Sequence, residues 1–85
     1  MDSKGKIPVV LKNNDSTLSM NRFEIYDEVA AETAGVFTLK GGEARPVEIC
    51  RGQDGKGRIR IRTLDPDPSA WVEIDSLAPG DVISP

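Results

Sequence analysis

The most distinctive chemical feature of this sequence is three arginines at two-residue spacing, Arg58, Arg60 and Arg62. Because alternate residues of a strand share one face, an extended chain places these guanidinium groups along about 13 Å of one surface. Such a row can contact successive phosphates of a nucleic acid, or carboxylates of a protein partner. The competing interpretation is a solvated sheet face that acids on neighbouring strands neutralise.

Trp71 and Glu48 are the other two candidate binding residues. The alternation of residues 70–75 places Trp71 on the arginine face, where its ring could stack on a guanidinium and anchor a partner. The alternative is that Trp71 folds over the edge of a small core. Glu48 is expected opposite Arg60 in a hairpin, where it would neutralise part of the arginine face.

Neither catalysis nor metal binding is predicted. The chain contains no histidine, the commonest general base and the commonest metal ligand. Residues 52–57 are rich in glycine but precede a strand, whereas a phosphate-binding loop precedes a helix. Cys50 lies beside Arg51, which would lower the pKa of its thiol, but no base stands near it in the sequence. We therefore expect no enzyme activity, no catalytic residue, no metal and no cofactor.

Length and composition predict one small globular domain spanning residues 1–85, with residues 1–6 as a disordered N-terminal tail. The chain is 38% hydrophobic and 29% charged and carries a net charge of −3. This negative charge argues against a protein whose main partner is bulk nucleic acid or an anionic membrane. A single cysteine and the lack of a long apolar segment near the start favour a soluble protein of the cytoplasm.

Residues 47–62 are predicted to form a β-hairpin around an Asp-Gly turn. Apolar residues alternate with polar ones on both sides of the turn. A three-residue loop, 53–55, pairs Ile49 with Ile59 and Val47 with Ile61, so the isoleucines share one face and the arginines the other. With residues 36–39 as a further strand in the same phase, the segment is expected to be a three-stranded meander.

Residues 22–34 are predicted to form a helix. Asn21 suits the N-cap, and Gly35 suits the position that ends a helix. At about 100° per residue the apolar side chains fall on one arc and the acidic ones on the opposite side. The acids repel one another at i,i+4 spacing, which weakens this prediction. A strand through residues 22–27 is the rival interpretation.

The C-terminal part is predicted to contain a strand at 70–75 and a type II turn with Pro79 and Gly80 at its centre. Residues 77–83 resemble the Leu-x-Pro-Gly-Asp-x-Ile/Val turn of several small β domains, including the actuator domain of P-type ATPases. Together these elements predict an α+β fold: an antiparallel meander of four to five strands with one helix, about 22–34, packed on its apolar face. The alternative is a small all-β barrel.

These observations favour a small, non-catalytic protein-interaction module with an accessory or regulatory role. Its partner would bind the outer sheet face, with Trp71 as anchor and the three arginines pairing with acids. The alternative is a nucleic-acid-binding protein that uses the stripe of Arg58, Arg60 and Arg62. A third hypothesis is a domain with no binding site.

Overall fold

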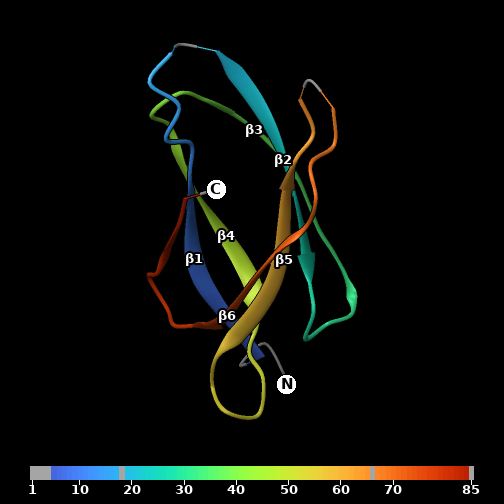
Figure 1. Ribbon diagram of the computed structural model, residues 1–85. Coiled ribbons are helices and arrows are strands. Elements are labelled where there is room, and N and C mark those ends of the chain that lie inside the picture. Colours follow the sequence, from blue (N-terminus) through green and yellow to red (C-terminus); the bar gives the residue numbers. More distant parts are fainter. Residues whose placement is uncertain (1–4, 18, 66, 85) are drawn as a thin grey trace.

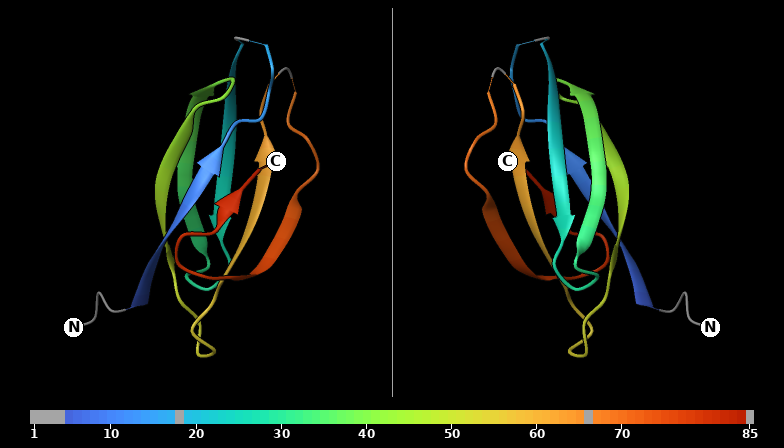
Figure 2. Two further views of the ribbon diagram at one scale, coloured as in Figure 1. Left: turned by 90° about the vertical axis from the view of Figure 1, so that its left-hand side faces the viewer. Right: turned by 90° about the vertical axis from the view of Figure 1, so that its right-hand side faces the viewer.

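The computed structural model describes residues 5–17, 19–65 and 67–84, and these residues form two β-sheets packed face to face (Figure 1). The strands are β1 (Lys6–Lys12), β2 (Met20–Asp27), β3 (Glu32–Lys40), β4 (Ala44–Cys50), β5 (Gly57–Thr63), β6 (Val72–Leu77) and β7 (Val82–Ile83). One sheet has the strand order β4-β1-β7, and the other has the order β3-β2-β5-β6. Figure 2 shows the first sheet in its left view and the second in its right view.

The core lies between the two sheets and follows from the alternation of each strand. Every second residue points inward and is apolar, so both sheets contribute a buried row. The buried hydrophobic residues are Ile7, Val9, Leu11, Phe23, Ile25, Leu39, Val47, Ile49, Ile59, Ile61, Leu77 and Ile83. Because aliphatic side chains dominate this set, the core depends on two interlocking sheets rather than on a helix.

The predicted helix at 22–34 is wrong: these residues form most of β2, the turn 28–31 and the start of β3. The α+β fold class is therefore wrong too, since the described residues contain no helix. Residues 22–27 alternate polar with apolar, so as a strand they bury Phe23 and Ile25 completely. Of the acids that would repel one another along a helix, Glu24 lies opposite Arg62 of β5, and Glu28 forms an ion pair with Arg60.

The predicted hairpin and meander are also wrong, because β3, β4 and β5 do not lie side by side. β4 pairs with β1, whereas β5 lies between β2 and β6 in the other sheet. The turn itself forms: Gly55 has a φ of 83°, and its N–H donates to the Gly52 carbonyl at 2.9 Å. Beyond it the strands separate, so Val47 and Ile49 face Ile59 and Ile61 across the core. The two sheets do not close into a barrel.

The C-terminal turn forms as predicted. The Asp81 N–H donates to the Ala78 carbonyl at 3.1 Å, and Gly80 has a φ of 87°, as the third position of a type II turn requires. This turn brings β7 alongside β1 in parallel. In β6, Ser76 has a φ of 61° at a bulge, which lets both Ile74 and Leu77 point inward although two residues rather than one lie between them.

Two buried polar side chains close the opposite ends of the sandwich. At one end, the Asn13 amide donates to Asn21 and to the Leu39 carbonyl. At the other end, Asp27 accepts hydrogen bonds from three backbone N–H groups, including that of Cys50 in the other sheet. Each side chain is only 4% exposed. Asn13 and Asp27 therefore link strands and turns to one another at the two ends of the core.

The N-terminal tail predicted for residues 1–6 falls largely outside the described residues, which begin at Gly5. Lys6 is the first residue of β1, and the Gly5 carbonyl accepts a hydrogen bond from the Arg51 N–H.

A separate finding concerns membranes. In the described part of the chain, no helix is long and apolar enough to cross a bilayer.

Candidate functional site

The candidate site is the outer face of the four-stranded sheet, called the charged face below. Its central strand pair is β2 and β5, whose outward side chains lie opposite one another. Arg62 is opposite Glu24, and Arg60 is opposite Tyr26 on one side and Glu73 of β6 on the other. The stripe predicted from the two-residue spacing is therefore interleaved with acids from both neighbouring strands.

Arg62 connects an ion pair to the only tryptophan. Its Nη2 and Nε atoms donate to the Glu24 carboxylate at 2.7 and 2.9 Å, so the planar guanidinium is held in one orientation. The guanidinium carbon lies 4.3 Å from the centre of the Trp71 ring, which is cation–π geometry. The stacking contact expected for Trp71 is thus present, and 36% of this residue stays exposed.

Arg60 is neutralised from two sides. Its Nε lies 3.1 Å from a carboxylate oxygen of Glu28 and 3.4 Å from one of Glu73. Arg58 is exposed, and within the described residues it forms no ion pair. Of the three arginines, Arg58 therefore has the charge most available to a partner.

Glu48 does not belong to this face, and its predicted pairing with Arg60 is wrong. It lies on β4, opposite Pro8 of β1, on the outer surface of the other sheet. Two of the acids that do face the arginines, Glu24 and Glu28, would lie on the solvated side of the helix that the sequence predicts for residues 22–34. Their alternation with the apolar residues of β2 was the available signal, since it places them on one side of a strand.

The loop between β5 and β6 is held to β2 by Asp65. Its carboxylate accepts a hydrogen bond from the Arg22 backbone N–H at 3.0 Å and from the Arg22 Nη2 at 2.8 Å. Within the loop, the Ser69 N–H donates to the Thr63 carbonyl at 2.8 Å. Because Trp71 is the last residue of this loop, these contacts help to set where its ring lies on the charged face.

We expect the Asp65 contact to stabilise the protein only above acidic pH. Hydrogen bonds from the Arg22 side chain lower the pKa of Asp65 below its ordinary value. The stabilisation is therefore complete above an ordinary carboxyl pKa of about 4, and it is lost as the pH falls through the lower pKa of the folded state. Asp65→Asn should unfold more easily than wild type near neutral pH, and the difference should vanish as the pH falls through the lowered pKa of Asp65.

The measurement is urea unfolding followed by tryptophan fluorescence, at a series of pH values. Asp67→Asn is the control, because Asp67 is an exposed acid of the same loop. An equal loss of stability in both variants, or a loss that stays constant down to low pH, would contradict the assignment.

Cys50 does not have the properties of a nucleophile. Burial, and then the nearby Asp27 charge, raise the pKa of its thiol, so the predicted lowering by Arg51 is wrong.

Within the described residues, no group of three or more His, Cys, Asp or Glu side chains could hold a metal ion. An open cleft of about 550 Å³ includes Arg58 in its wall, and its other lining residues are Glu28, Val29, Gly52, Gln53, Asp54, Lys56, Asp75 and Ser76. Side chains of both charge signs line it, so it selects no ligand by charge.

Comparisons with protein-family models, with curated proteins and with solved structures find no match for this chain.

Proposed function

We propose that this protein is a non-catalytic interaction module, with an accessory or regulatory role, whose protein partner binds the charged face around Trp71. The observation that carries the proposal is the position of the Trp71 ring. A domain of 85 residues has little apolar area to spare, yet its largest side chain lies on the surface against Arg62. Preorganised aromatic and arginine side chains are enriched among the residues that dominate binding energy.

The surroundings of Trp71 define the chemistry of this partner. Across the sheet, Val36, Glu24 and Arg62 form one row that leads to Trp71, and Val36 is 54% exposed. Val36 and Trp71 make the two ends of this row apolar, and at its centre the charges of Glu24 and Arg62 neutralise each other. It therefore fits a protein surface with apolar groups and few charges, and Arg58 can add one ion pair with an acid at the rim. We place this interaction in the cytoplasm, because the chain has one cysteine and so no internal disulfide to preserve.

The test is affinity capture from an extract with wild-type protein, Trp71→Ala and Val82→Ala. Val82 is the matched control, since it is 57% exposed but belongs to the other sheet. Proteins that depend on the charged face should be captured by wild type and Val82→Ala and lost at least tenfold with Trp71→Ala, as for a residue that contributes over about 1.4 kcal/mol. The proposal fails if Trp71→Ala retains every partner.

We expect the arginine stripe not to bind nucleic acid with useful affinity. Glu24, Glu28 and Glu73 neutralise Arg60 and Arg62, so few counterions would be released from a bound polyanion. Titration of short RNA and DNA at about 50 mM salt should give a dissociation constant above roughly 0.1 mM. Tight binding that weakens steeply with added salt, and weakens further in Arg58→Ala, would instead support the nucleic-acid alternative.

A further inference from the structure

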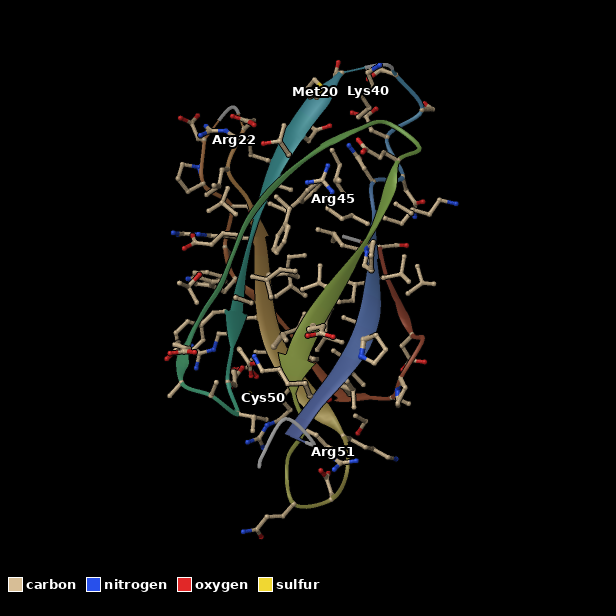
Figure 3. All side chains as sticks on the ribbon, turned by 180° about the vertical axis from the view of Figure 1, so that it is seen from behind. Met20, Arg22, Lys40, Arg45, Cys50 and Arg51 are labelled. Atoms are coloured by element: carbon tan, nitrogen blue, oxygen red, sulfur yellow. The ribbon has the colours of Figure 1, made fainter. Side chains whose placement is uncertain are left out.

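We propose that the domain self-associates by pairing β3 with β3 of a second copy, antiparallel about a two-fold axis. β3 is an outer strand of the four-stranded sheet, since β2 is its only partner in the described part of the chain. Figure 3 views this side of the molecule, where β3 runs to the turn beside Lys40. This surface is the edge of the sheet that borders the charged face, and Val36 contributes its side chain to that face and its backbone to the edge.

The direction of the β3 amides follows from the hydrogen bonds of β2. The Arg22 N–H and carbonyl bond to Asp65 and Leu64, so they point toward β5. Backbone groups alternate along an antiparallel strand, and therefore those of the next residue, Phe23, point toward β3. Phe37 lies opposite Phe23, so the N–H and carbonyl groups of Phe37 point toward β2. Its neighbours, Val36 and Thr38, consequently direct their N–H and carbonyl groups away from the sheet.

Side chains of the same copy bind backbone N–H groups of the residues near Val36 and Thr38. The Lys40 N–H donates to the Glu43 side chain at 2.9 Å. Gly35 has the same parity as Phe37, and its N–H donates to the Thr33 hydroxyl at 3.2 Å. Between these positions, no backbone partner for the amides of Val36 and Thr38 is found among the described residues.

The edge of the other sheet on this side is protected. By the same alternation, the outward positions of β4 include Pro46, which has no N–H, and Cys50, whose N–H is bound by Asp27 at 2.7 Å. In contrast, residues 33–39 of β3 contain neither a charge nor a proline. β3 therefore presents a short and unprotected edge, which is the surface that strand pairing requires.

A second copy can pair with this edge because its own Val36 and Thr38 present the same outward backbone groups. With Phe37 on the two-fold axis, Val36 lies opposite Thr38 of the other copy, and the reverse holds, giving four backbone hydrogen bonds. The charges also agree. In this register Lys40 lies opposite Ala34 of the other copy, two residues along the strand from its Glu32, so the lysine and the glutamate are diagonal neighbours of opposite charge.

The contact is short, so the dimer should be weak and depend on concentration. Four backbone hydrogen bonds over a few residues bury less than a typical stable interface. We expect half of the protein to be dimeric at a concentration on the order of 0.1 mM.

The test is sedimentation equilibrium of the full chain from about 10 μM to about 1 mM. Three variants accompany wild type. Thr38→Pro removes one outward N–H, and Thr38→Lys brings like charges together across the axis. Glu48→Pro is the control, because it places proline at an outward position of β4. We expect both Thr38 variants to weaken dimerisation at least tenfold and Glu48→Pro to leave it unchanged.

Amide NMR spectra of each variant check that the domain stays folded, and they also supply a local measurement. In wild type, exchange of the Val36 and Thr38 amide protons with solvent should slow as the concentration rises. A monomer throughout the concentration range would overturn the proposal, as would a dimer that neither Thr38 variant weakens. Trp71→Ala should dimerise like wild type, so this result is independent of the function proposed for the charged face.

Discussion

Replacing Asp27 with alanine should lower the free energy of unfolding by about 3–4 kcal/mol, because three backbone N–H groups lose their acceptor. One carboxylate oxygen accepts from Val29 and Ala30, both at 3.1 Å, which shapes the turn after β2. The other accepts from Cys50 at 2.7 Å, across to the second sheet. A domain of this size has roughly 4–13 kcal/mol of stability, so the loss is a large part of the total.

Asp54→Ala is the matched control. Asp54 makes a similar local bond, accepting from the Lys56 N–H at 3.1 Å, but it is exposed, so water replaces the lost acceptor. We expect Asp54→Ala to lower the free energy of unfolding by less than about 1 kcal/mol. Urea unfolding of both variants provides the comparison. A cost for Asp27→Ala no larger than that for Asp54→Ala would show that the buried carboxylate does not join the two sheets.

Gly41→Ala should be the second strongly destabilising substitution, with a loss of about 3 kcal/mol. A Cβ atom at position 41 would lie 2.0 Å from the Thr17 carbonyl oxygen and 2.5 Å from that of Asp15. Both are backbone atoms, so no side-chain rotation relieves the overlap. The loop after β1 would have to move away, and the hydrogen bond from the Gly41 N–H to the Ser19 carbonyl would be lost.

Gly42→Ala separates this overlap from ordinary backbone strain. Gly42 has a φ of 85°, which disfavours alanine, but nothing lies within 4 Å of its added Cβ. We expect a cost of about 1 kcal/mol from the left-handed backbone alone. Thermal and urea unfolding should therefore show that Gly41→Ala is much less stable than Gly42→Ala. The reverse order would contradict the close approach of the loop to residue 41.

The inward and outward sides of most strands could be predicted from the sequence, whereas the strand partners could not. Alternation alone correctly turns Val47, Ile49, Ile59 and Ile61 inward. It does not distinguish two strands that pair side by side from two that face each other across a core, because both bury the same residues. The Asp-Gly turn favoured the local hairpin, but β1, far away in the sequence, is the actual partner of β4.

The candidate site was predicted in part, for the same reason. Parity along β5 and the residues before β6 placed Trp71 and Arg62 on one face, and these side chains do stack. The acids that neutralise the stripe depend on β2 lying beside β5, a contact between segments about 38 residues apart, as for Glu24 and Arg62. A periodicity of 3.6 and one of 2 both describe residues 22–27, and only this distant pairing decides between them.

The most direct test of the proposed function is photo-crosslinking from each sheet face. A benzophenone side chain replaces Tyr26, which lies opposite Arg60 on the charged face, or Val82, on the outer surface of the other sheet. Both proteins are irradiated in cell extract at about 1 μM, a concentration at which the proposed dimer is absent. We predict a discrete protein adduct from position 26 that Trp71→Ala abolishes. Adducts from position 82 alone would contradict a partner site on the charged face.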